Sequence, residues 1–252
     1  MHRRWFEKFL PKEGVKYKNR SDDFHGIAIS GPNSRKLLSK ICRDDISEEN
    51  FKFRDTRETF VGGVPAILNR ISFSGELGYE IYVPPQFQLK LFEEIETHGK
   101  ELSLKLYGAR ALMSLRLEKN WGAWTLDFRP DFTAAESGLD AFINWDKEFV
   151  GKKAAQDEKK QGVKKKLVTM TIETKDIDVT NDEAILKDDK CIGYITSGGY
   201  AHHVKKSMAL GYVPTELSEQ DTTLEVEING KLYSARVTEK PLYDANGGKM
   251  RS

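Results

Sequence analysis

Hydrophobic residues in the first 120 positions follow two different periods. Strict alternation predicts strands, and spacing by three or four residues predicts amphipathic helices. The expected strands are residues 26–30 and the two arms of a hairpin over residues 64–83, and the expected helices begin near residues 34, 86 and 108. Residues 120–145 are rich in aromatic and turn-forming residues without a clear period, which predicts a long ordered loop. A short amphipathic helix is also predicted at the amino end, with Trp5, Phe6 and Phe9 on one stripe.

The pattern changes after a lysine-rich stretch at residues 151–166, which is typical of a solvated helix and a linker. Beyond it, short alternating segments and an Asn229-Gly230 turn predict antiparallel strands closed into a small barrel or a sandwich. Gly198-Gly199, before Tyr200 and two histidines, predicts a tight loop. We therefore expect an α+β region over residues 1–157, followed by a small antiparallel β-barrel domain over residues 165–252.

Composition narrows the possible functions. The chain has 252 residues, 31% of them charged, and a formal net charge of +1, so nothing indicates a nucleic-acid partner. No apolar run is long enough to predict a membrane span. Cys42 and Cys191 lack metal-ligand spacing, and the adjacent His202 and His203 point apart on a strand. We expect no metal site and a reducing, cytoplasmic location.

Several self-contained catalytic motifs are absent from the sequence. There is no GxGxxG fingerprint, phosphate-binding loop, HExxH or GxSxG. We therefore expect no FAD site in this chain.

The stretch SFSGELGYEIYV, residues 72–83, places a carboxylate inside an apolar strand. A period of two puts Tyr79, Ile81 and Val83 on one face and leaves Glu80 and Tyr82 on the other. One interpretation is that Glu80 is solvated on a half-exposed hairpin. The other is that Glu80 lies in a pocket beside aromatic residues such as Phe73 and accepts paired N–H donors from a ligand.

The stretch YGARALMSLRLEK carries two arginines on one predicted helix. Arg110 and Arg116 are six residues apart and therefore lie on different faces. From the pattern alone, each arginine could make surface ion pairs with nearby acids or bind an anion.

Six phrases in this order resemble the aminomethyltransferase family, which comprises the T-protein of the glycine cleavage system and the folate-binding portions of dimethylglycine and sarcosine dehydrogenases. They are IAISGPNSRKLL, SFSGELGYEIYVP, YGARALMSLRLEK, FTAAESGLDAF, FVGKKAA and SGGYAHHVKKSMALGYV, and they span nearly the whole chain. The run RLEKNWGAWTLDFRPDFTAAESGL resembles the dimethylglycine dehydrogenase branch more than the glycine-cleavage branch. A related protein of iron–sulfur and tRNA maintenance is disfavoured, because WDKEFVGKKAA lacks the Lys-Gly-Cys phrase of those relatives.

The resemblance implies a tetrahydrofolate-dependent one-carbon transferase, which moves an aminomethyl or methylene unit from an amine donor to tetrahydrofolate. It implies that Glu80 binds the 2-amino and ring N–H edge of the pterin, and that Phe73 packs or stacks against the ligand. Arg110 is then the candidate partner of the anionic portion of folate, and Arg116 is expected to be structural.

The resemblance also implies that the family's catalytic aspartate lies upstream of Met1, so no catalytic residue is assigned in this chain. Two alternatives stay open: a non-catalytic folate-binding module, or a subunit completed by a partner that carries the aspartate. The possible partners are a flavin dehydrogenase chain or a carrier protein, and the expected location in a eukaryote is the mitochondrial matrix.

Overall fold

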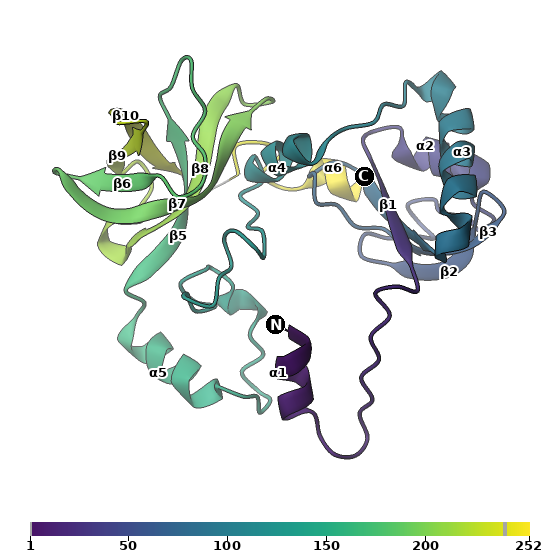
Figure 1. The fold of residues 1–252 in the computed structure, drawn as a ribbon, viewed down its shortest axis with the longest axis horizontal. Coiled ribbons are helices and arrows are strands. Elements are labelled where there is room, and N and C mark those ends of the chain that lie inside the picture. Colours follow the sequence, from purple (N-terminus) through teal and green to yellow (C-terminus); the bar gives the residue numbers. More distant parts are fainter. Residues whose placement is uncertain (1, 239–240) are drawn as a thin grey trace. The chain divides into compact units, whose positions relative to one another are not determined.

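The structure, a computed structural model, describes residues 2–238 and 241–252 (Figure 1). The chain divides into two compact units, one of residues 2–71 and 77–104, the other of residues 72–76 and 105–252. The domain boundary expected between residues 157 and 165 was inferred from sequence composition, whereas the two units are defined by compactness. That boundary stays a prediction.

The first unit is built on a four-stranded antiparallel sheet in the order β1-β4-β3-β2. Its strands are β1 (His25–Ser30), β2 (Thr56–Val61), β3 (Val64–Asn69) and β4 (Gly78–Val83). Its helices are α1 (His2–Phe9), α2 (Ser34–Ile41), α3 (Gln88–Gly99) and the 3₁₀ turns η1 (Pro85–Phe87) and η2 (Lys100–Leu102). The predicted strands and helices are therefore present, and β2 is a strand that the sequence pattern did not indicate.

One face of this sheet packs against α2 and α3 because both elements present their apolar stripe to it. The buried cluster contains Leu37 and Leu38 from α2, Leu91 and Ile95 from α3, and Tyr79, Ile81 and Val83 from β4. The expected alternation in β4 is confirmed, since these three residues are buried while Glu80 and Tyr82 are half-buried on the other face. Burial of seven large side chains in one cluster is the main source of stability for such a layer.

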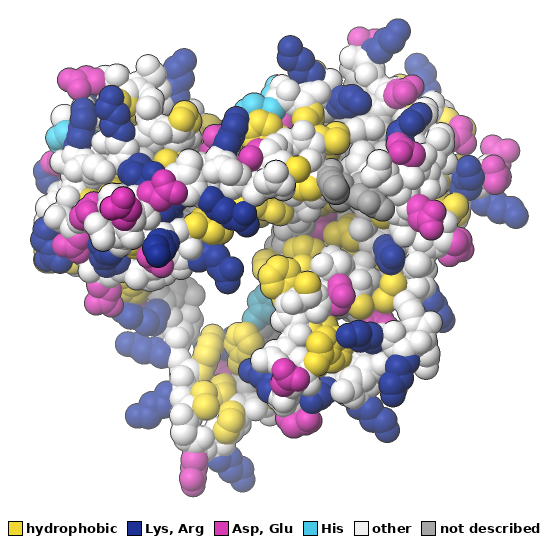
Figure 2. Space-filling model, turned by 180° about the vertical axis from the view of Figure 1, so that it is seen from behind, with side chains coloured by type: hydrophobic (Ala, Val, Ile, Leu, Met, Phe, Trp, Pro, Cys, Tyr) yellow, Lys and Arg dark blue, Asp and Glu magenta, His cyan; other side chains and the backbone are white. Residues whose placement is uncertain are grey.

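Helix α1 keeps its hydrophobic stripe exposed. Trp5, Phe6 and Phe9 are 54%, 51% and 41% exposed, and Figure 2 shows hydrophobic side chains on the surface of this helix. No described helix combines the length and apolar character needed to cross a bilayer.

The second unit is a closed antiparallel barrel with strand order β10-β5-β8-β7-β6-β9, preceded by helices and a long loop. The strands are β5 (Lys165–Ile172), β6 (Ala184–Lys187), β7 (Lys190–Ala201), β8 (Lys206–Pro214), β9 (Thr223–Ile228) and β10 (Lys231–Thr238). The helices are α4 (Ala109–Leu117), α5 (Lys152–Gln161), α6 (Gly248–Arg251) and the 3₁₀ turns η3 (Asp140–Phe142) and η4 (Thr215–Leu217). The predicted β-barrel is confirmed, and residues 120–139 form the expected loop; residues 239–240 of the expected strand region lie outside the described residues.

The expectation of a tight loop at Gly198-Gly199 is wrong, because both residues lie inside β7. A Cβ on Gly198 would lie 2.7 Å from the carbonyl oxygen of Val179. Glycine is therefore required there by a close approach of two backbones, a common use of glycine within strands.

Candidate functional site

Glu80 lies in the middle of β4, on the sheet face that points away from α2 and α3. Its neighbours in the ladder are Ala28 of β1 and Asn69 of β3. Directly opposed residues on neighbouring antiparallel strands point to the same face of the sheet. The side chains of Glu80 and Asn69 therefore project side by side.

The Glu80 carboxylate is held by a neighbour on its own strand. The Tyr82 hydroxyl donates a hydrogen bond of 2.7 Å to Glu80 Oε2. This bond, together with burial of the ring, raises the pKa of Tyr82 to about 12, so the phenol stays a donor at neutral pH. Gly26 lies opposite Tyr82 and gives its ring room, since a Cβ there would lie 3.1 Å from Tyr82 Cε1.

Asn69 is a polar residue at this place that sequence reasoning missed. Its Oδ1 atom is buried and has no hydrogen-bond partner among the described residues. A buried acceptor without a donor is costly in a folded protein and needs an explanation. No local signal in the sequence identifies Asn69, because its place directly opposite Glu80 depends on the register between β3 and β4.

A cavity of about 420 Å³ lies on the same sheet face, within the first unit. Its walls include Phe24, Phe60, Pro65 and Ile67. Ile67 lies directly opposite Tyr82, so the cavity begins one strand away from the Tyr82–Glu80 pair. The face that carries Glu80 is thus hollowed and partly apolar, as small-molecule sites usually are.

Phe73 belongs to the second unit, where it is half-buried. Its ring stacks on Trp121 with centroids 6.5 Å apart and an interplanar angle of 17°. Trp121 was not predicted as a site residue. Together with Phe73 it forms a surface of two stacked aromatic rings. The expectation that Phe73 lines the Glu80 pocket concerns two different units and stays a prediction.

Arg110 lies in the first turn of α4 and is exposed. No acidic side chain within the described ranges pairs with it at 4.0 Å or less, so the surface ion pair that its pattern allowed is absent there. Its guanidinium therefore keeps all its donors available for an anion.

Arg116 is buried and structural, as expected. It is 1% exposed, and its Nη1 donates to Asp127 Oδ2 at 2.7 Å and to the Trp121 carbonyl at 2.8 Å. Asp127 also accepts from the Ala123 N–H at 2.7 Å and the Ser197 hydroxyl at 2.6 Å. This network ties α4 and the loop after it to β7.

A second group of ionisable residues, gathered around the buried Glu118, was missed by sequence reasoning. The Glu118 carboxylate is fully buried and accepts from the His203 backbone N–H at 2.7 Å and from His203 Nδ1 at 2.5 Å. The His203 ring stacks on Tyr243 at 4.2 Å, and the Tyr243 hydroxyl donates to Glu76. Burial raises the pKa of Tyr243, and its bond to Glu76 raises it further. No group of three or more metal-ligating side chains within the described residues could hold a metal ion.

Comparison with known proteins adds the family. The model of the GCVT N-terminal domain matches residues 1–147, and the model of the glycine cleavage T-protein C-terminal barrel domain matches residues 165–244. The chain belongs to the glycine cleavage T-protein family of aminomethyltransferases. The resemblance inferred from the six sequence phrases is thereby confirmed, and the barrel described above corresponds to the second family domain.

Two relatives of this T-protein family member represent its two branches. Mitochondrial dimethylglycine dehydrogenase of Homo sapiens is 37% identical over 243 residues, which are 95% of this chain and 28% of that protein. An aminomethyltransferase of Desulfitobacterium hafniense is 33% identical over 244 residues, which are 96% of this chain and 66% of that protein. The chain therefore spans under a third of the first relative and about two thirds of the second.

The T-protein fold is also seen in a solved structure. The glycine cleavage system aminomethyltransferase T of Bartonella henselae superposes with a TM-score of 0.77 and 22% identity, covering 88% of this chain and 60% of that one. At this identity the similarity establishes the α+β and barrel architecture.

Proposed function

We propose that this chain binds tetrahydrofolate and acts in the transfer of a one-carbon unit from an amine-derived donor to it. The observation that carries the proposal is the Glu80 carboxylate, fixed by Tyr82 on a hollowed sheet face beside the unpartnered Oδ1 of Asn69. Membership of the T-protein family makes a reduced folate the ligand to test first.

The side chains present fit the donor edge of a pterin. That edge carries an amino group with two N–H donors and an adjacent ring N–H. Glu80 keeps one Oε2 lone pair for Tyr82 and offers its remaining lone pairs to two of these donors. Asn69 Oδ1, after a small side-chain rotation from its buried position, is the acceptor for the third.

In this proposal the chain contributes binding and orientation. Bound tetrahydrofolate supplies the nitrogen that receives the one-carbon unit. Glu80 and Asn69 set the direction of the pterin ring, and Arg110 neutralises the carboxylates at the other end of folate. The stacked pair of Phe73 and Trp121 offers an aromatic surface that shields the ligand from water. Positioning of this kind lowers a barrier without covalent participation of the protein.

The donor and the partner are parts of the same proposal. The similarity to dimethylglycine dehydrogenase favours an imine or formaldehyde equivalent from a flavin dehydrogenase chain over an aminomethyl carrier protein as the source of the one-carbon unit. A non-catalytic folate-binding module remains the alternative, because the assigned residues all bind the ligand and none reacts with it.

Calorimetry with tetrahydrofolate tests the pterin contact. Glu80→Gln preserves the shape of the side chain but replaces one acceptor oxygen with a donor. Hydrogen bonds to charged groups contribute about 1.5–3 kcal/mol each, so binding is expected to weaken about 10- to 100-fold. Glu96→Gln, an exposed substitution on α3 of the same unit, is the matched control. Equal affinities for the wild type and Glu80→Gln would remove Glu80 from the site.

A single-turnover assay separates a transferase from a binding module. Formaldehyde or an aminomethyl donor is mixed with the tetrahydrofolate-bound protein, and formation of methylenetetrahydrofolate is followed against the uncatalysed rate. Acceleration that depends on Glu80 supports the transferase. Tight binding without acceleration supports the module or a subunit completed by a partner.

A further inference from the structure

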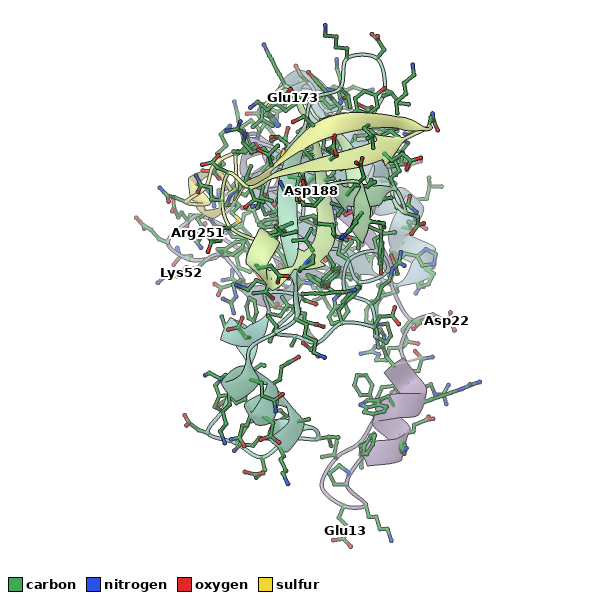
Figure 3. All side chains as sticks on the ribbon, turned by 90° about the vertical axis from the view of Figure 1, so that its left-hand side faces the viewer. Glu13, Asp22, Lys52, Glu173, Asp188 and Arg251 are labelled. Carbon is green, nitrogen blue, oxygen red and sulfur yellow. The ribbon has the colours of Figure 1, made fainter. Side chains whose placement is uncertain are left out.

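One end of the barrel carries a second cavity, which the proposed folate contacts do not use. It has a volume of about 740 Å³ and is lined by the end of β5 and the residues after it, by the β7–β8 turn and by β10. Figure 3 labels Glu173, the first residue after β5, which lines the cavity. The volume falls within the range of small-molecule sites, about 300–1,000 Å³.

Most charged side chains in the wall of this cavity are cationic. Four cations stand against the single lining carboxylate of Glu173, which leaves three net positive charges; they are Lys175, Lys205, Lys206 and Arg236. None of the three lysines has an acidic side chain within 4.0 Å in the described part of the chain. Arg236 lies 3.6 Å from Asp221, but both side chains are more than 60% exposed, so this ion pair contributes little. Such a concentration of positive charge attracts anions.

A buried hydroxyl in the wall lacks a partner. Ser207 is 3% exposed, and its Oγ has no hydrogen-bond partner among residues 2–238 and 241–252. In the barrel ladder it lies between Ile172 of β5 and Tyr200 of β7, and all three residues line the cavity. A buried hydroxyl that stays unpaired destabilises the folded protein, so a bound ligand oxygen would explain its presence.

Further hydroxyl residues surround the cations. Thr171, Thr174 and Ser234 also line the cavity. Thr171 lies directly opposite Arg236 in the ladder between β5 and β10, so both side chains project from the same face of the barrel wall. The wall therefore offers neutral donors beside charged ones.

Hydrogen bonds hold the wall in place from two sides. The Glu173 backbone N–H donates to the Ser234 carbonyl at 2.9 Å, which fixes the chain after β5 to β10. On the other side, the Ser114 hydroxyl of α4 donates to the Tyr200 carbonyl of β7. The cavity is thus formed before any ligand binds, as small-molecule sites usually are.

Phosphate groups match this wall better than carboxylates do. Each phosphate group carries a charge of about −1.5 to −2 and three strong acceptor oxygens, whereas a carboxylate carries one charge and two oxygens. Three net positive charges call for two or three phosphates rather than one. The cations are confined to a cavity in a chain whose net charge is only +1, which favours a small ligand over a nucleic acid.

We propose that the barrel cavity binds a small molecule with a diphosphate or triphosphate group. Arg236 offers its planar fork to one phosphate, and Lys175, Lys205 and Lys206 act as point charges for the others. The Ser207 hydroxyl donates to a phosphate oxygen and so gains the partner that it otherwise lacks. This binding site lies beyond the proposed folate function and is independent of it.

Calorimetry with inorganic tripolyphosphate tests the proposal on the intact chain. One molecule is expected to bind per chain, at least about tenfold more tightly than inorganic phosphate, because several weak ion pairs act together. Salt screens such contacts over a Debye length of about 8 Å at physiological ionic strength, so concentrated salt should weaken binding. The double variant Lys175→Gln/Lys206→Gln is expected to lose about tenfold in affinity.

The matched control is Lys153→Gln/Lys190→Gln, which removes the same charge from exposed positions on α5 and at the start of β7. It is expected to keep the wild-type affinity. Absence of tripolyphosphate binding by the wild type, or equal loss in the cavity variant and the control, would overturn the proposal, and neither result bears on folate binding.

Ser207→Ala separates a ligand contact from a structural role. Because the hydroxyl lacks a partner, the variant is expected to unfold in urea at the same or a higher concentration than the wild type. It is nevertheless expected to bind tripolyphosphate about tenfold more weakly, since a hydrogen bond to a charged group is lost. Wild-type affinity, or a clear loss of stability, would remove Ser207 from the site.

Adenosine triphosphate, measured beside tripolyphosphate, distinguishes a free oligophosphate from the phosphate end of a nucleotide. Tighter binding of the nucleotide favours the second source, and equal or weaker binding favours the first. Either result supports the site if Lys175→Gln/Lys206→Gln weakens it, and nucleotide binding that this variant retains in full counts against the cavity.

Discussion

The bond between Tyr82 and Glu80 makes a sharp prediction for the variant Tyr82→Phe. The substitution keeps the ring that packs beside Gly26 and removes the hydroxyl that donates 2.7 Å to Glu80 Oε2. Glu80 then stays half-buried without this donor. Since a hydrogen bond to a charged acceptor contributes about 1.5–3 kcal/mol and the pair is partly solvated, we expect the free energy of unfolding to fall by about 1.5 kcal/mol near neutral pH.

The pKa of Tyr82 gives the same prediction a pH dependence. The bond to Glu80 and burial raise this pKa to about 12, against about 10 for an unperturbed tyrosine. The folded state therefore retains its proton more strongly than the unfolded state. The stability from the neutral phenol is complete below about pH 10 and is lost as pH rises towards about 12, at most about 2.7 kcal/mol for two pKa units.

Urea unfolding of the wild type and Tyr82→Phe at about pH 8 and about pH 11 measures both effects. The two compact units can unfold in separate transitions, so each transition is fitted by itself. The wild type is expected to have the higher free energy of unfolding at the lower pH, and this gap between the two proteins should narrow at the higher pH. Tyr17→Phe removes an exposed phenol from the same unit and should produce no gap at either pH. A gap that is absent, or that does not narrow, would refute the reasoning.

Three further predictions concern the second unit. Arg116→Leu leaves the buried Asp127 carboxylate without its cation, and urea unfolding should show a loss of about 3–5 kcal/mol; a loss below about 1 kcal/mol would contradict the buried pair. Gly198→Ala puts a methyl group 2.7 Å from the Val179 carbonyl oxygen and should destabilise by about 1–3 kcal/mol, also in urea. Wild-type stability of Gly198→Ala would show that the loop segment at Val179 can move away from β7. Arg110→Gln should leave the unfolding curve unchanged, because the side chain is exposed, and weaken tetrahydrofolate binding about 3- to 10-fold by calorimetry; unchanged binding would exclude Arg110 from the folate contact.

The sequence predicted those helices and strands whose hydrophobic period matches the face that they bury in the folded protein. The alternation in GYEIYV and the spacing of Leu37 and Leu38 both reflect a single buried face, so periodicity was enough. Strand β2 was missed because TRETFV shows no alternation: its two apolar residues, Phe60 and Val61, are adjacent, and its inner face includes the polar Arg57 and Thr59. Its turn did carry a signal: Gly62 and Gly63 both have positive φ, +60° and +76°, which suits a two-residue hairpin loop.

The functional contacts that the sequence did not reveal are those that depend on strand register and on approach between distant segments. Asn69 becomes a candidate because β3 pairs it with Glu80, and a shift of one residue would move it to the α2–α3 face. Ser207 becomes one because β5 and β7 close the barrel around it. Gly198 also could not be interpreted from the sequence. Its sequence context is typical of a loop, and only the nearby backbone of Val179 explains why a strand needs glycine there. A motif therefore identified the carboxylate, while pairing between strands determines which acceptors lie beside it.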